Sequence, residues 1–202
     1  MSEQDRNAEH ARAMKALKAE RDVMMAEKRE GEGLLMVHTG DGKGKSTAAF
    51  GMVARALGWG YKVGVVQYIK GKWITGERQF FKRFPDQVRY AVMGEGFTWD
   101  VADRERDIAA ARAAWATSLE MIADPELHLV VLDELNIALR YEYLAVDEVV
   151  AALQARPADK HVCVTGRNAP QALLDAADLI TEFQAVRHPF DAGFKAQRGV
   201  DF

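Results

Sequence analysis

Short apolar runs alternate with longer segments of helical periodicity from about residue 31 to the end of the chain. Four of these runs are near-continuous Val, Leu, Ile or Met, which is typical of strands buried on both faces of a parallel sheet. With two less regular runs they give six strand candidates, at residues 34–38, 63–68, 88–93, 129–133, 161–165 and 179–184.

Helices are predicted between these strands, at residues 46–57, 103–123, 147–155 and 170–177. The longest of them places a set of apolar side chains on one face at helical spacing, namely Ile108, Ala111, Trp115, Leu119 and Ile122. Strands that alternate with helices form βαβ units. The pattern therefore predicts an α/β domain over residues 31–202, with three layers around a doubly wound, mostly parallel sheet.

Residues 1–30 differ from the rest of the chain, because they contain no Gly or Pro and are rich in Ala, Glu, Lys and Arg. This composition favours a helical arm. Its apolar stripe is thin and consists of Met14, Leu17, Met24 and Met25. A helix with so little to bury either frays or docks on another surface. Both a partly disordered arm and a helix ordered by a partner subunit or ligand are compatible with this pattern.

Composition excludes several classes. The 202 residues are 49% apolar and 28% charged, with a net charge of −3, so neither nucleic acid nor an anionic membrane is expected as a partner. No run is apolar enough to cross a membrane, and the N-terminus lacks the apolar core of a signal peptide. A cytoplasmic protein is expected. The single cysteine, Cys163, lies in an apolar run and is expected to be a buried, unreactive thiol.

The first predicted strand runs directly into TGDGKGKST, residues 39–47, which opens the first predicted helix. Glycines let backbone N–H groups approach phosphate oxygens, and the start of the helix adds its dipole. Lys45 can reach the terminal phosphates, and the Ser46 hydroxyl can ligate Mg²⁺. The usual pattern has Gly where this chain has Thr39, but strand and helix are the required context. The predicted ATP-binding residues of this P-loop are Gly40, Asp41, Gly42, Lys43, Gly44, Lys45, Ser46 and Thr47, in a sheet of the RecA-like NTPase type.

An apolar strand that ends in two acids, Asp133 and Glu134, resembles a Walker B strand. An acidic pair at the end of a strand is often a helix cap or a solvated turn. Next to a P-loop, however, such carboxylates can hold magnesium directly or through water. Ser46, Asp133 and Glu134 are therefore the predicted ligands of Mg²⁺ or Mn²⁺.

Motifs beyond the P-loop indicate which kind of P-loop protein this is. Residues 39–55 read TGDGKGKSTAAFGMVAR, 65–78 VVQYIKGKWITGER, 94–100 GEGFTWD, 130–135 VVLDEL, 165–167 TGR, and 190–202 FDAGFKAQRGVDF. In order and at matching spacing, these resemble the P-loop type of bacterial ATP:corrinoid adenosyltransferases from about residue 33 to the C-terminus.

The resemblance implies that a cob(I) corrinoid attacks the 5′ carbon of ATP and that inorganic triphosphate leaves. ATP would lie in the loop in the reverse sense from kinases. Lys45 and Glu134 are then the expected catalytic residues at the phosphate end. Arg167 and Arg55 match family positions near the nucleotide, although Arg55 lies on a helix where it could equally be a surface residue.

The family also places an aromatic pair under the corrinoid ring, where it displaces the lower axial ligand of cobalt and so eases reduction. The matching residues are Phe97 and Trp99, which are counted as corrinoid-binding and catalytic. Two large apolar side chains in a glycine-flanked loop are costly to leave in water unless something covers them. Without the resemblance, a loop folded back on the core explains them as well.

Family likeness further implies a homodimer, in which the N-terminal helix covers the neighbour's nucleotide, and an electron-donating flavoprotein as a partner. The sequence does not define the preferred corrinoid, the reductase or the role of the C-terminal tail.

His38, next to the P-loop, is expected to pack at a strand end. Two alternatives stay open, namely a P-loop kinase for a small molecule and a nucleotide-dependent corrinoid-binding protein without turnover. The kinase would leave Phe97 and Trp99 unexplained.

Overall fold

The computed structural model describes residues 2–28, 31–68, 75–92 and 104–201. The chain divides into two compact units, Met1–Glu32 and Gly33–Phe202, which are described separately. Among the residues described, no helix has both the length and the apolar character needed to span a membrane.

The first unit holds a single helix, α1 (Glu3–Ala26). Ser2 caps its start in a capping box, because the Asp5 backbone N–H donates to the Ser2 hydroxyl and the Asp5 carboxylate accepts from the Ser2 backbone N–H. None of the residues of α1 is buried, and its large apolar side chains, such as Leu17 and Met24, are about half exposed or more. The helical arm is thus formed by local propensity and capping, without a packed face.

The second unit alternates strands and helices as the sequence pattern predicts. Its elements are β1 (Leu35–Thr39), α2 (Lys45–Gly58), β2 (Lys62–Gln67), α3 (Gly76–Phe81), β3 (Val88–Val92), α4 (Arg104–Ala123), β4 (Leu127–Asp133), α5 (Leu135–Arg140), α6 (Val146–Gln154), β5 (His161–Thr165), α7 (Gln171–Ala176), β6 (Leu179–Glu182) and the 3₁₀ helix η1 (Pro189–Ala192).

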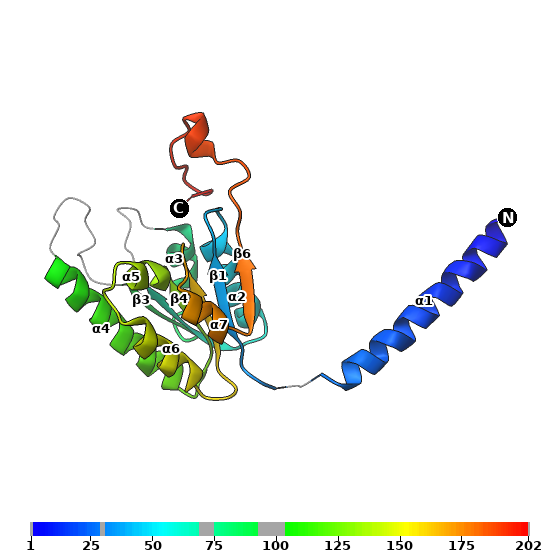
Figure 1. Ribbon diagram of the computed structural model, residues 1–202, viewed down its shortest axis with the longest axis horizontal. Helices are drawn as coiled ribbons and strands as arrows, with labels where there is room; N and C mark the ends of the chain where they lie inside the picture. Colours follow the sequence, from blue (N-terminus) through cyan, green and yellow to red (C-terminus); the bar gives the residue numbers. More distant parts are fainter. Residues whose placement is uncertain (1, 29–30, 69–74, 93–103, 202) are drawn as a thin grey trace. The chain divides into compact units, whose positions relative to one another are not determined.

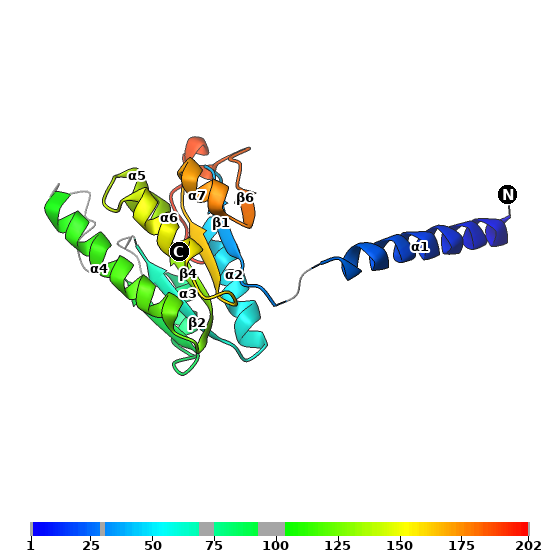
Figure 2. The same cartoon turned by 60° about the horizontal axis from the view of Figure 1, so that its bottom comes forward.

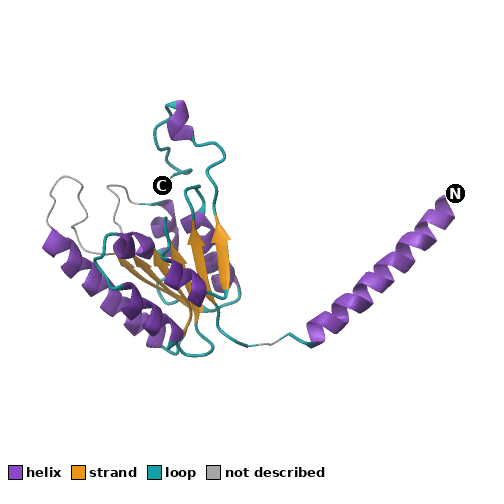
Figure 3. Cartoon of the chain, viewed as in Figure 1, coloured by secondary structure: helices purple, strands orange, loops and turns teal. Residues whose placement is uncertain are grey.

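Six strands form one sheet in the order β3-β2-β4-β5-β1-β6. All five pairings are parallel, so the described sheet is entirely parallel rather than mostly so. The carboxyl ends of the strands therefore meet at one edge, to which the arrows in Figure 3 point. In this order β5 separates β1 from β4, so Thr165, the last residue of β5, lies between the ends of β1 and β4.

Alternate residues of each central strand face opposite layers of helices. In β4, Val130 and Leu132 pack in the cluster that includes α4, α6 and α7, whereas Leu129 and Val131 pack in the cluster that includes α2 and α3. Figures 1 and 2 show these two helical layers on either side of the sheet. Burial on both faces explains why these strands read as unbroken apolar runs. It also confirms the predicted three-layer α/β fold and the buried position of Cys163.

The structure differs from the predicted elements in three places. Two helices, α3 and α5, were not predicted, since each has only six residues and shows less than two turns of periodicity. In α4, Leu119 is 39% exposed, while the buried positions after Trp115 are Ser118, Met121 and Ile122. Leu119 follows Ser118 by one residue, so it points about 100° away from the buried stripe.

Candidate nucleotide site

The loop between β1 and α2 has the backbone that a phosphate-binding loop requires. Gly44, directly before α2, has a φ of 110°, a conformation that L side chains rarely adopt. A Cβ at Gly42 would lie 2.6 Å from the backbone oxygen of Gln184, so a side chain does not fit there either. The segment after β6 therefore packs directly against the loop, and the Gly42 N–H donates to the Phe183 carbonyl at 2.6 Å.

Lys45, the first residue of α2, is only 7% exposed. Its ammonium group donates to two carbonyls of the loop, Gly40 O at 2.7 Å and Gly42 O at 2.6 Å. Burial lowers the pKa of Lys45, and the nearby Glu134 carboxylate opposes that shift. The ammonium is thus held over the loop, where an incoming phosphate chain would replace the carbonyl contacts with charge-assisted ones.

Asp133, the last residue of β4, is 2% exposed and fully hydrogen-bonded. It accepts from the Thr165 hydroxyl at 2.8 Å and from the Gln67 amide at 3.2 Å, and the Ser46 side chain also acts to lower its pKa. Burial raises the pKa of Asp133, while these hydrogen bonds act to lower it. Ser46 of the P-loop helix and Asp133 of β4 line the same cavity, and the cation that they are predicted to share stays a prediction.

Thr165, at the end of β5, fixes both acids at once. Its hydroxyl donates to Asp133 and accepts from the backbone N–H of Glu134 at 2.9 Å. This arrangement depends on the strand order, because β5 lies next to β4 with its carboxyl end at the same edge. The carboxylates are therefore positioned by the sheet itself.

Glu134 has an unusual backbone and an unusual side chain. Its φ of 61° is left-handed, which costs a non-glycine residue on the order of 1 kcal/mol or more. Burial and the neighbouring Asp133 raise the pKa of Glu134 to about 7, although Lys45 and Arg167 oppose the shift. One carboxylate oxygen, Oε2, is buried without a hydrogen-bond partner in the structure. Such strain and an unpaired buried acceptor are typical of a functional position.

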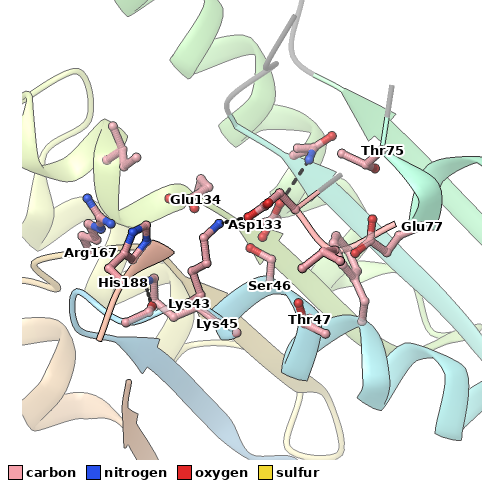
Figure 4. A pocket seen from close by; sticks show the side chains of 17 residues that line it. Lys43, Lys45, Ser46, Thr47, Thr75, Glu77, Asp133, Glu134, Arg167 and His188 are labelled. Atoms are coloured by element: carbon pink, nitrogen blue, oxygen red, sulfur yellow. Dashed lines mark hydrogen bonds and ion pairs between the residues drawn. The ribbon is translucent and has the colours of Figure 1, made fainter. Parts of the chain in front are cut away.

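These groups surround a cavity of about 540 Å³ above the P-loop. Figure 4 shows Lys45 in the middle, with Ser46, Thr47 and Asp133 on one side and Lys43, Arg167 and His188 on the other. The cavity is lined by Gly42, Lys43, Gly44, Lys45, Ser46, Thr47, Phe50, Gln67, Thr75, Glu77, Asp133, Glu134, Ile137, Arg167, His188, Val200 and Asp201.

The C-terminal tail supplies a wall of this cavity that the sequence did not predict. His188, Val200 and Asp201 line it, and the Asp201 carboxylate forms an ion pair with Lys43 of the loop. The only signal for this wall was the likeness of residues 190–202 to the family motif. Three further lining residues were not predicted, namely Gln67, Thr75 and Glu77, although all three lie within the motif at residues 65–78.

Most of the predicted nucleotide residues come together, but some do not. Arg167 lines the cavity and donates to the Asp41 carbonyl at 3.2 Å, whereas Gly40 and Asp41 shape the loop without lining the cavity. Arg55 is exposed near the end of α2 and does not line the cavity, so its role in ATP binding stays a prediction.

Two further predictions concern single positions. His38 is buried, with Nδ1 3.1 Å from the Lys45 carbonyl oxygen, which agrees with its predicted packing role. Phe97 and Trp99, the predicted corrinoid pair, lie outside the described residues.

The residues present fit a hard divalent cation. Magnesium prefers oxygen ligands and keeps several waters and substrate phosphates, so few protein ligands suffice. Ser46, Asp133 and Glu134 offer a hydroxyl and two carboxylates, one of which carries the unpaired Oε2. No group of three or more His, Cys, Asp or Glu side chains in the described part of the chain is arranged to hold a metal, and this site offers two carboxylates beside the Ser46 hydroxyl.

A P-loop between β1 and α2, and paired acids at the carboxyl end of β4 in the same parallel sheet, define a P-loop nucleotide-binding α/β protein. Comparison with known proteins narrows this class. The sequence model of the ATP:corrinoid adenosyltransferase BtuR/CobO/CobP family matches residues 31–202. The chain therefore belongs to this family and is an enzyme of that class.

Curated relatives agree over nearly the whole chain. A corrinoid adenosyltransferase of Pseudomonas aeruginosa is 57% identical over 198 residues, which cover 98% of this chain and 98% of the relative. The corrinoid adenosyltransferase CobA of Salmonella typhimurium is 49% identical over 181 residues, covering 90% and 91%. Among solved structures, the RadB recombinase aligns with a TM-score of 0.46 at 19% identity, over 78% of this chain and 77% of that one.

Proposed function

We propose that this enzyme transfers the 5′-deoxyadenosyl group of ATP to the cobalt of a cob(I) corrinoid, in the biosynthesis or salvage of adenosylcobalamin. The electron pair of cobalt forms the bond to the 5′ carbon. The bond from that carbon to the α-phosphate oxygen breaks, and its electron pair leaves on inorganic triphosphate. The observation that supports this proposal is the cavity in which Lys45 and the P-loop face Asp133 and Glu134, in a chain of this family.

The phosphate end of the site would work by electrostatics. The whole triphosphate is the leaving group, so negative charge grows on it as the carbon–oxygen bond breaks. Lys45, Lys43 and Arg167 line the cavity and bring three positive charges to that group. Lys45 is buried and hydrogen-bonded to the loop before reaction, so it would stabilise the charge with little reorganisation.

A magnesium ion would be held by Ser46 and Asp133, with Glu134 directly or through a water, and would neutralise part of the triphosphate charge. Asp133 is kept in position by hydrogen bonds from Thr165 and Gln67. Glu134 brings a carboxylate whose Oε2 has no protein partner. No general base is needed, since cobalt itself is the nucleophile.

At the corrinoid end, we assign Phe97 and Trp99 to the lower face of the ring, where they would keep the axial ligand off cobalt. The support is the GFTWD motif. Alanine at both positions should cut activity severely when the enzyme starts from cob(II)alamin with a biological reductant. The loss should be much smaller with chemically prepared cob(I)alamin, and ATP affinity should barely change. Equal losses from both starting states would mean that the pair only binds the ring or supports the fold.

We further propose a homodimer in which the arm of one subunit covers the nucleotide site of the other. The exposed apolar side chains of α1 support a docking role for this helix. An electron-donating flavoprotein would supply the electron for cob(II), and the cytoplasm, where ATP is made, is the proposed location.

One spectroscopic experiment separates the candidate functions. Incubation of the protein with Mg²⁺, ATP and reduced cobalamin should give a light-sensitive alkylcobalt spectrum and one equivalent of triphosphate. Formation of ADP would indicate the kinase alternative. A spectral shift on binding, with neither alkylcobalt product nor triphosphate, would indicate a corrinoid-binding protein without turnover.

A further inference from the structure

The last described residue of the tail, Asp201, lies among the cations of the phosphate site. Its carboxylate pairs with the Lys43 ammonium through Oδ1 and accepts from the Gln197 N–H at 2.7 Å through Oδ2. The Asp201 side chain is 10% exposed, whereas that of Lys43 is 50% exposed. The carboxylate is thus fixed by the turn at Gln197–Asp201, and the lysine beside it has room to move.

Asp201 and a triphosphate are competing anions at this site. Lys43 belongs to the P-loop and lines the same cavity as Lys45 and Arg167. An ammonium group that pairs with a carboxylate has less of its charge available to a phosphate oxygen. The hydrogen bonds from Lys43 and from the Gln197 N–H lower the pKa of Asp201, so its carboxylate is charged while it holds the lysine.

We propose that Asp201 is a positioning residue that promotes release of triphosphate by taking back Lys43 after the transfer. This inference rests on the proposed function, in which triphosphate is the product. The entire phosphate chain of ATP leaves as one polyanion, and a site with several fixed cations would hold that product tightly. A tail carboxylate that recaptures one of these cations weakens the grip after the chemistry, without touching the reacting atoms.

The test is the affinity of the full-length protein for inorganic triphosphate with Mg²⁺, measured by calorimetry. Asp201→Asn removes the competing charge and keeps an oxygen for the Gln197 N–H. It should tighten triphosphate binding by about twofold to about tenfold, as expected for a partly exposed ion pair. Steady-state kcat should fall together with KM for ATP, because product release becomes slower. Asp201→Ser should behave in the same way.

Two controls isolate the ion pair. Asp191→Asn makes the same charge change in the same tail, on an exposed residue that does not line the cavity, and should leave the affinity unchanged. In a Lys43→Ala background, Asp201→Asn should have no effect, because the lysine for which the anions compete is gone.

The proposal is overturned if Asp201→Asn binds triphosphate equally or more weakly, since the carboxylate would then only position Lys43 for the ligand. It is also overturned if Asp191→Asn tightens binding as much. Formation of alkylcobalt product by the unaltered enzyme, measured in parallel, reports on the proposed function separately from these affinity differences.

Discussion

The two sides of the nucleotide cavity are built in opposite ways. On the sheet side, Asp133 is buried and receives hydrogen bonds from side chains on two neighbouring strands, Thr165 and Gln67. On the tail side, no residue from 183 to 201 is buried, and the ion pair between Asp201 and Lys43 holds the end of the tail to the loop. The sheet side is preorganised for the charge of the phosphates, whereas the tail side can exchange partners. Stability and nucleotide affinity should therefore depend mainly on the sheet side.

The largest expected effect comes from Lys45, whose buried ammonium is hydrogen-bonded to the loop. Lys45→Ala removes charge-assisted hydrogen bonds to the triphosphate worth about 1.5–3 kcal/mol each, so ATP should bind roughly tenfold to a hundredfold more weakly or worse. Titration calorimetry with ATP and Mg²⁺ measures this. Lys62→Ala is a matched control, since Lys62 begins β2, at the edge of the sheet away from the nucleotide site, and forms an exposed ion pair with Glu126. Unchanged ATP affinity in a folded Lys45→Ala variant would contradict the P-loop assignment.

The next effect, from Glu134, is on stability rather than on ATP affinity, and it depends on pH. The pKa of Glu134 is about 7 in the fold against 4.5 ordinarily, so the folded state holds more protons than the unfolded state between these values. The free energy of unfolding should therefore fall as pH rises from about 4.5 to about 7, by up to roughly 3 kcal/mol. Glu134→Gln should remove this part of the slope and unfold at higher urea concentration than the parent at pH 8. Identical pH profiles would show that the strained carboxylate is not coupled to stability.

The helical arm contains no buried residue, so its removal should change the stability of the protein least. Deletion of residues 1–28 should leave Tm nearly unchanged, because α1 buries none of its side chains. If the arm covers a partner's nucleotide site, the apparent KM for ATP should rise. Thermal unfolding and steady-state kinetics of the truncated enzyme check both points. A large drop in Tm with normal kinetics would make α1 part of a core.

The sequence predicts the sheet side well, because each of its parts has a local signature. The P-loop, the acidic end of β4 and all six strands follow from glycine spacing and from apolar runs that need burial on both faces. The observed limits of the strands differ from the predicted ones by two residues at most. The side chains that hydrogen-bond to Asp133 could not be predicted, because the strand order brings Thr165 to it from 32 residues away.

The tail side could not be predicted in the same manner. Residues 183–201 contain a single short 3₁₀ helix, Pro189–Ala192, and show no periodicity, so their contact with the loop leaves no pattern in the sequence. The six-residue helix α3, which follows Thr75 and brings Glu77 to the cavity, was missed for a similar reason. The Thr75 hydroxyl accepts from the Arg78 N–H, and a threonine N-cap was the one signal that could have revealed this helix.

The chain contains one cysteine, and its place in the middle of the sheet makes it a natural reporter. Cys163 has no exposed surface, and burial raises the pKa of its thiol to about 12. Because alkylating reagents attack the thiolate, labelling requires β5 to separate from its neighbours first. The labelling rate therefore measures how often the sheet opens, without any engineered probe. ATP, if it binds only the closed sheet, should slow that rate in proportion to its occupancy.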